Sequence, residues 1–165
     1  MNFNEMNIST ERLVLRGIRI SDAESIFKYR SNPQIYKFQG WRPQTIEEVK
    51  EFICEKVAKI PNIPDTWYQL GILLKETDEL IGDIGIHFID SDNLQVELGF
   101  TLSLDHQCKG YATEAITGVI NYLFNNLKKH RIIASVDPRN TKSIALLERI
   151  QMRKEAHFKK SFWFD

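Results

Sequence analysis

Residues 105–114 read Asp-His-Gln-Cys-Lys-Gly-Tyr-Ala-Thr-Glu and stand between two strongly patterned segments. Before them, residues 94–102 alternate apolar and polar side chains, which is typical of a half-buried strand. After them, apolar residues recur every three or four positions from Ala112 to Leu127, which indicates an amphipathic helix of about four turns. The quoted stretch is therefore a strand–loop–helix junction.

This junction has the chemistry of a phosphate site. The first N–H groups of a helix lack partners within the helix, and the helix dipole is positive there. Gly110 lets the backbone approach a ligand closely, Ala112 keeps the first turn slim, and Lys109 adds a mobile charge. Neither of the common glycine-rich phosphate patterns, GxxxxGK[ST] or GxGxxG, occurs. A plain connection between a strand and a helix also explains these residues.

The rest of the chain predicts a mixed α/β domain in the order β-α-α-β-β-β-α-β-α-β, antiparallel in its first half. Helices begin at the capping boxes Ser21–Glu24 and Thr45–Glu48, and the second runs to Ile60 before Pro61 and Pro64 end it. Another helix follows Asn140 and ends near Ile150. The expected strands cover residues 12–16, 67–74, 80–89, 94–102, 131–136 and 154–162.

Composition indicates one domain over residues 1–165 and excludes several classes of function. Lys plus Arg and Asp plus Glu both number 22, so net charge favours neither nucleic acid nor a membrane as partner. Cys54 and Cys108 predict free thiols in a reducing cytosol, and we expect a cytoplasmic protein because no signal peptide or spanning segment is visible. The four histidines lack metal-ligand spacing, which predicts no metal.

The end of the chain is unusual because it stops in the aromatic run Phe162-Trp163-Phe164. A sheet of the expected size would continue beyond this point. We therefore expect either a chain truncated at its C-terminus or an edge covered by a partner chain in a homodimer.

The pattern Gln-x-x-Gly-x-Ala at residues 107–112, followed by Thr-Glu-Ala, resembles the pyrophosphate loop of the GNAT superfamily of N-acetyltransferases. Three other segments resemble, in the right order, its ribosomal-protein N-terminal acetyltransferase (RimJ/RimL-like) branch. They are Thr10–Arg16, Val96–Phe100 and Asn140–Arg149. The resemblance covers about residues 9 to 160.

The resemblance implies a GNAT fold with four flanking helices, in which two neighbouring parallel strands splay into a V that holds acetyl-coenzyme A. The pantetheine arm would pair with the backbone of Phe100, Thr101 and Leu102. Asn140 would touch that arm, although a plain N-cap explains this residue equally well. The pyrophosphate would rest on amides of the loop, with Thr113 nearby; the loop residues are Gln107, Cys108, Lys109, Gly110, Tyr111 and Ala112.

The reaction needs a neutral amine, a stabilised oxyanion and a proton for the thiolate that leaves. Glu97 is the candidate general base, acting through a water, and its alternative role is a cross-strand salt bridge. A backbone N–H near Phe100 would stabilise the oxyanion. The resemblance makes Ser143 the candidate acid in place of the usual tyrosine, although a serine in a first helical turn is also ordinary polar filler.

Two positions depart from the family pattern. Cys108 stands where glycine is common and would be strained if that position needs a positive φ. Gln151-Met152 replaces the usual Gly-Phe, which indicates a different ending of the last helix.

The expected acceptor is the N-terminal α-amine of a protein or peptide, because about a tenth of such amines is neutral at pH 7. The alternatives are a small amine (a polyamine or an aminoglycoside), a non-catalytic domain that binds acyl-coenzyme A, and a plain interaction protein.

Overall fold

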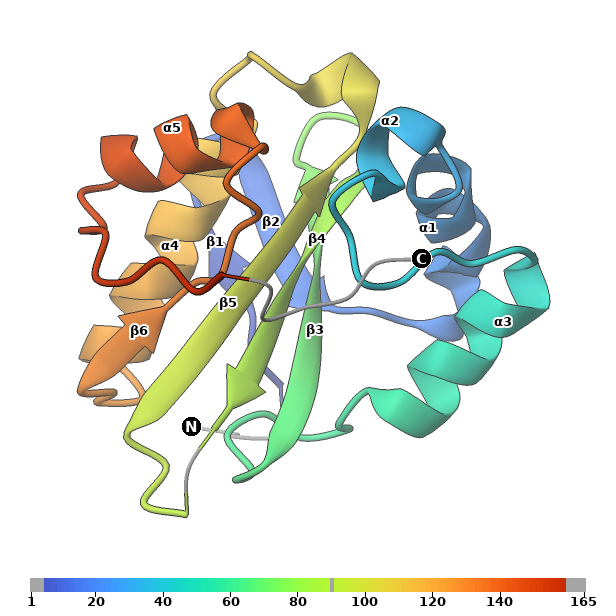
Figure 1. Ribbon diagram of the computed structural model, residues 1–165. Helices are drawn as coiled ribbons and strands as arrows, with labels where there is room; N and C mark the ends of the chain where they lie inside the picture. Colours follow the sequence, from blue (N-terminus) through green and yellow to red (C-terminus); the bar gives the residue numbers. More distant parts are fainter. Residues whose placement is uncertain (1–4, 90, 160–165) are drawn as a thin grey trace.

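A six-stranded sheet forms the middle of the protein, in a computed structural model that describes residues 5–89 and 91–159 (Figure 1). Neighbouring strands follow chain order, and only the last pair is parallel. The antiparallel meander predicted from the short connections is confirmed. The strands are β1 Ile8–Ser9, β2 Leu13–Gly17, β3 Thr66–Leu74, β4 Leu80–Phe88, β5 Gln95–Leu102 and β6 Arg131–Ile133.

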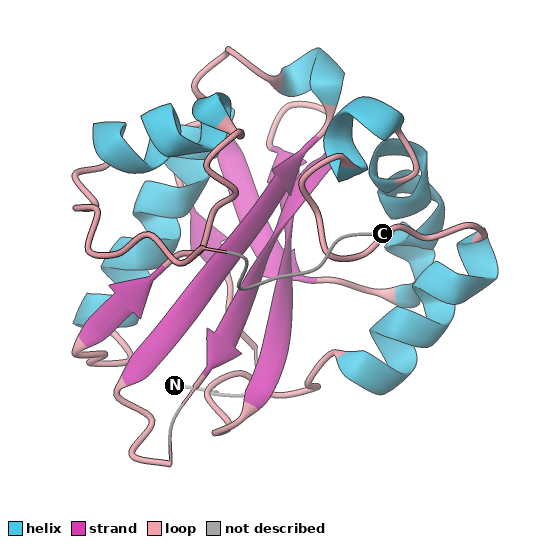
Figure 2. Cartoon of the chain, viewed as in Figure 1, coloured by secondary structure: helices cyan, strands magenta, loops and turns pink. Residues whose placement is uncertain are grey.

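Helices cover both faces of this sheet (Figure 2). On one face α4 and α5 pack on a core that includes Ile84, Ile86 and Leu146. On the other face α1, α2 and α3 enclose a second core that includes Ile26 and Val49. The α-helices are α1 Ala23–Arg30, α2 Pro33–Tyr36, α3 Ile46–Glu51, α4 Tyr111–Asn125 and α5 Thr141–Arg149. No helix within the described ranges is long and apolar enough to cross a bilayer.

Helix α1 is tied to the sheet by a buried cluster around Asp83 of β4. The Asp83 carboxylate is 1% exposed and accepts hydrogen bonds from Arg30 Nε at 3.0 Å, Arg30 Nη2 at 2.5 Å and Gln69 Nε2 at 2.5 Å. The phenol of Tyr29 donates to the same carboxylate. Burial, reinforced by the charge of Asp83, raises the pKa of the Tyr29 phenol, which therefore stays protonated as a donor. One arginine thus balances one buried carboxylate.

Strands β5 and β6 pair over only three residues and then separate. Residues 95–97 of β5 pair with residues 131–133 of β6, and β6 ends there. Strand β5 continues to Leu102, so residues 98–102 have a strand neighbour on the β4 side only among the described residues. The strand predicted over residues 131–136 is therefore three residues too long, because its partner no longer lies alongside. The gap corresponds to the V that the resemblance implied.

Several predicted boundaries are wrong. The helix expected to run to Ile60 changes after Glu51 into a π-helical turn, Phe52–Lys56. Ser21 is not the N-cap of its helix, because the Asp22 carboxylate accepts the backbone N–H of Arg19 at 2.7 Å and a short 3₁₀ turn, Ile20–Asp22, precedes α1. Helix α2 was not predicted, although its Asn32 cap and Pro33 at the first position are ordinary start signals.

The strand predicted over residues 154–162 is also wrong where it can be checked. Residues 154–159 are irregular and exposed, and Glu155 pairs with Arg131 and Arg153 instead of joining a strand ladder. Residues 160–162 and the aromatic run at 162–164 lie outside the described residues, so the interface expected there stays a prediction.

Candidate functional site

The loop between β5 and α4 turns sharply at two left-handed residues. A short 3₁₀ turn, Leu104–His106, is followed by Cys108 at φ 61° and Gly110 at φ 83°, and α4 begins at Tyr111. Glycine suits the second position for two reasons, because a Cβ there would also lie 3.2 Å from Nη2 of Arg12. Cys108 does adopt a positive φ, so the backbone strain that the sequence analysis made conditional on a positive φ is present at this residue.

The loop presents a row of unused backbone donors. The N–H groups of residues 108 to 113 make no hydrogen bond within the described part of the chain. Gln107 differs, because its N–H already donates to the carbonyl of Leu104 at 3.1 Å. Of the six amides expected to receive a pyrophosphate, those of residues 108–112 are therefore available.

Two cations from α5 flank these amides. Lys142 Nζ lies 3.5 Å from Gln107 Oε1, and Arg149 Nη1 lies 3.4 Å from Thr113 Oγ1. Both cations project from α5, seven positions apart and therefore on one helical face. Lys142 and Arg149 were not identified from the sequence as candidate phosphate ligands. Their spacing of seven residues, directly after the Asn140 cap, was a signal that could have identified them.

A salt bridge fastens the start of α4 to the first strands. Glu114 accepts hydrogen bonds from Thr10 Oγ1 at 2.6 Å, Arg12 N at 2.7 Å and Arg12 Nε at 2.7 Å. The Arg12 guanidinium also lies 4.5 Å from the centre of the Tyr111 ring and donates to the Lys109 carbonyl at 3.1 Å. The loop is thus held by Arg12 as well as by the contacts from α5.

Replacing Glu114 by glutamine should lower the free energy of unfolding at pH 7, because Arg12 loses its ionic partner. The loss should be only about 1 kcal/mol, because the Arg12 guanidinium is partly exposed and its charge is screened by solvent. Burial alone would raise the pKa of Glu114, but the bonds from Thr10 and Arg12 outweigh burial and lower it. The ionised carboxylate therefore stabilises the fold above the ordinary pKa of about 4.3. This contribution is lost as pH falls through the lowered folded pKa.

Urea unfolding of the parent and the Glu114→Gln variant between pH 7 and pH 3 tests this dependence. The two stabilities should converge toward the acid end. A gap that stays constant with pH would show that the charge of Glu114 is not involved.

Replacing Cys108 by glycine should raise the free energy of unfolding by about 0.5–1 kcal/mol. A left-handed conformation costs an ordinary residue about 1–2 kcal/mol, and glycine avoids this cost. The larger conformational entropy of glycine in the unfolded state offsets part of the stability gained. Urea unfolding measures the change. Cys108→Ala is the matched control, since it removes the thiol and keeps the strain; an equal gain in both variants would contradict the backbone explanation.

The residues expected to hold the pantetheine arm line the open edge of β5. Thr101 and Leu102 are buried and Phe100 is half-buried, while the Thr101 hydroxyl has no hydrogen-bond partner within the described residues. The Asn140 side chain accepts the backbone N–H of Ser143 at 3.2 Å, so its role as N-cap of α5 is confirmed. Ser143 is half-buried in the first turn of α5.

Glu97, the expected base, lies where β5 and β6 separate. Its Oε1 accepts a hydrogen bond from Ser135 Oγ at 2.7 Å, just past the end of β6. Its cross-strand neighbour on β4 is His87, and no cation pairs with it among the described residues. The alternative role as one half of a cross-strand salt bridge with a lysine or arginine is therefore not observed there.

Two other carboxylates that a cationic acceptor could use, Asp83 and Asp137, already pair with arginines. Asp83 is buried against Arg30. Asp137 pairs with Arg139 at 2.7 Å, and hydrogen bonds from Arg139 lower the pKa of Asp137 to about 2. Of the three, only Glu97 carries a charge that no described cation balances.

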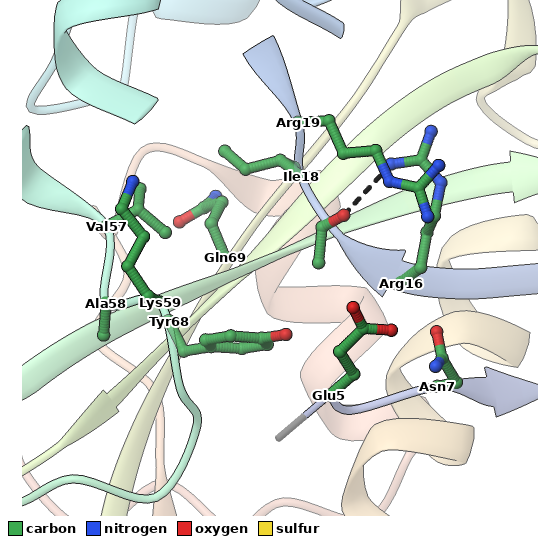
Figure 3. A pocket seen from close by; sticks show the side chains of 11 residues that line it. Glu5, Asn7, Arg16, Ile18, Arg19, Val57, Ala58, Lys59, Tyr68 and Gln69 are labelled. Carbon is green, nitrogen blue, oxygen red and sulfur yellow. Dashed lines mark hydrogen bonds between the residues drawn. The ribbon is translucent and has the colours of Figure 1, made fainter. Parts of the chain in front are cut away.

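Two hollows lie away from this edge of β5. Figure 3 shows a cavity of about 130 Å³ beside β2 and β3, lined by charges of both signs that include Glu5, Arg16 and Lys59. An open groove of about 670 Å³ runs along α4 from Thr113 past Asn121. No cluster of three potential metal ligands occurs among residues 5–89 and 91–159.

A model of the family described as acetyltransferase (GNAT) domain matches residues 12–153. The chain belongs to the GNAT acetyltransferase family. Within this family, it is 36% identical over 147 residues to an uncharacterized N-acetyltransferase, p20, of Bacillus licheniformis, a match that covers 88% of this chain and 82% of that protein.

Two further matches, to proteins named for their substrates, are more distant. The [ribosomal protein uS5]-alanine N-acetyltransferase of Escherichia coli strain K12 is 25% identical over 164 residues, covering 96% of this chain and 84% of that protein. The structure of a spermidine N-acetyltransferase from Vibrio cholerae, in complex with CoA and spermine, matches with a TM-score of 0.80 at 21% identity, over 93% of this chain and 88% of that one. The second match bears on the fold alone, and the two proteins differ in substrate.

Proposed function

We propose that this GNAT protein transfers the acetyl group of acetyl-coenzyme A to the N-terminal α-amine of a protein or peptide. The observation that carries the proposal is the row of unbonded amides at residues 108–113, beside the open edge of β5 and flanked by cations of α5. Free N–H groups at the start of a long helix suit a diphosphate. An unpaired strand edge suits an arm of amide groups that pairs as a strand would.

The proposed coenzyme contacts follow the order of the chain. Phe100, Thr101 and Leu102 would hold the arm through their backbone. The amides of Cys108, Lys109, Gly110, Tyr111 and Ala112 would hold the phosphates, with Thr113, Lys142 and Arg149 beside them. Asn140 would approach the arm only through the part of its amide not used for capping.

In the proposed reaction the coenzyme supplies a thioester, and the chain handles protons and charge. Glu97 accepts a proton from the amine through a water, the amine nitrogen bonds to the acyl carbon, and the carbon–sulfur bond breaks. A backbone N–H near Phe100 stabilises the charge on the carbonyl oxygen, a contribution of about 3 kcal/mol for one donor. Ser143 relays a proton from solvent to the sulfur, which leaves as a thiol, and the proton held by Glu97 returns to solvent.

Charge favours an α-amine over a polyamine as acceptor. A polyamine carries several positive charges and needs several free carboxylates. Asp83 and Asp137 are balanced by Arg30 and Arg139, which leaves Glu97 to face one cation. A peptide N-terminus brings one charge, and its pKa of about 7.7–8.0 leaves a usable neutral fraction at pH 7.

Thermal unfolding with acetyl-coenzyme A, followed by thiol release against N-terminal peptides, spermidine and aminoglycosides, tests the proposal. Saturation at about 100 times Kd should add about 2.7 kcal/mol of stability. Stabilisation without thiol release from any amine would indicate a non-catalytic domain that binds acyl-coenzyme A. No stabilisation would overturn the proposal.

A further inference from the structure

Gly99 leaves a bare patch on the sheet face that Glu97 shares, whereas the glycine that faces it across the strands, Gly85, is buried. Gly85 of β4 pairs in register with Gly99 of β5, and both lie on the face covered by α1, as does Asp83. A Cβ placed on Gly99 would meet no atom of the described residues within 4 Å, so these residues leave the space over Gly99 open. Gly99 stands two residues from Glu97, and side chains two residues apart on a strand share a face.

An aromatic pair borders the bare patch. The rings of Trp67 on β3 and His87 on β4 stack 4.7 Å apart at an angle of 5°. A Cβ on Gly85 would lie 3.0 Å from Gln69 Oε1 and 3.2 Å from Trp67 Cζ3, so the missing side chain of Gly85 lets the indole lie over β4. Adjacent strands are about 4.8 Å apart, which puts the edge of the indole one strand from the open space over Gly99.

This aromatic pair is accessible although it lies on a sheet face between buried neighbours. Trp67 is 41% exposed, whereas Gln69, two residues further along the same strand, is buried. An exposed tryptophan lying flat on a sheet provides a large apolar surface at little cost in side-chain entropy, as residues that dominate binding interfaces do.

We propose that Trp67 and Gly99 determine acceptor specificity, with the acceptor peptide lying over Gly99 and its first residues against the Trp67 indole. The inference rests on the proposed function, because it places the amine beside Glu97. The occupant is a peptide, since one uncompensated carboxylate next to an apolar ring matches one positive charge followed by an uncharged chain. Trp67 acts on binding, and Gly99 acts by leaving room.

Two variants test the assignment through steady-state thiol release with the best peptide acceptor. Trp67→Ala should lower kcat/KM for the peptide about 10-fold or more, mainly through KM, while KM for acetyl-coenzyme A stays unchanged. Gly99→Val should do the same by filling the open space, without lowering Tm, because β-branched residues suit strands. Phe124→Ala is the matched control, since Phe124 is also 41% exposed but lies on α4.

The failures of the two proposals are distinguishable. If acetyl-coenzyme A does not raise the Tm of the unaltered protein, the proposed function fails and takes this inference with it. If the coenzyme binds and a peptide is acetylated, yet both variants keep the parent KM for that peptide, only the inference is overturned. Preference for spermidine over every peptide, with no effect of Trp67→Ala, overturns it equally.

Discussion

Replacing Asp83 by alanine should lower the free energy of unfolding by about 3–5 kcal/mol, the largest stability effect expected in this chain. The change leaves the Arg30 guanidinium, whose side chain is 11% exposed, without its counter-charge in a buried site. Tyr29 and Gln69 lose their acceptor at the same time. Urea unfolding followed by circular dichroism measures the loss, and a variant that does not fold agrees with the prediction.

A surface ion pair provides the control for Asp83. Glu47 lies 3.6 Å from Lys50 on α3 and is 75% exposed, so Glu47→Ala should cost less than about 1 kcal/mol. Asp83→Asn keeps one acceptor oxygen and should fall between the two. Equal stability of the Asp83→Ala and Glu47→Ala variants would mean that the buried cluster does not hold α1 on the sheet.

Replacing Glu97 by glutamine should lower kcat with a peptide acceptor at pH 7 by about 100-fold or more, the largest catalytic effect expected. Glutamine keeps the shape and can still bond to Ser135, but it cannot accept a proton from the attacking amine. The deficit should shrink above about pH 8, where an α-amine is mostly neutral by itself. Initial rates of thiol release across this pH range measure both effects.

The controls for Glu97 separate chemistry from positioning. Stabilisation by acetyl-coenzyme A should be the same in the parent and in Glu97→Gln, because the proposed phosphate contacts lie elsewhere. Ser135→Ala removes the hydroxyl that holds Glu97 and should cost far less than the glutamine variant. If the Glu97→Gln deficit is independent of pH, or if Ser135→Ala is as damaging, Glu97 is a positioning residue and not the base.

Elements with a strong period were predictable from sequence. The period-two pattern of residues 94–102 and the apolar stripe of residues 112–127 predicted β5 and α4 to within about two residues. Both patterns arise because one side of the element faces the core. Every second residue is therefore apolar in the strand, and apolar residues recur at spacings of three and four in the helix. The N-cap of α5 at Asn140 was also predictable from the sequence.

The errors fall where a local signal depends on a distant partner. Ser21 and Asp22 both resemble caps, and only the fold shows that the Asp22 carboxylate bonds to Arg19 and Arg16. A strand over residues 154–159 would need a neighbouring strand to pair with. In the structure Glu155 forms ion pairs with Arg131 and Arg153 instead.

The candidate site was predictable in its loop and not in its surroundings. Gln107 to Thr113 are contiguous, so a motif reveals them. Lys142 and Arg149 reach the loop only because α5 packs against α4, and Trp67 reaches the face of Gly99 only through the register of β3, β4 and β5. Contacts between separate elements leave no local pattern in the chain.

The three-residue pairing of β5 with β6 has a consequence for handling the protein. The main-chain groups of residues 98–101 that point away from β4 have no strand beside them among the described residues, and a bare strand edge invites pairing with any extended chain. The opening that suits a ligand is thus also a template for self-association. We expect preparations of the protein to remain monodisperse longest when a ligand fills the gap between β5 and β6.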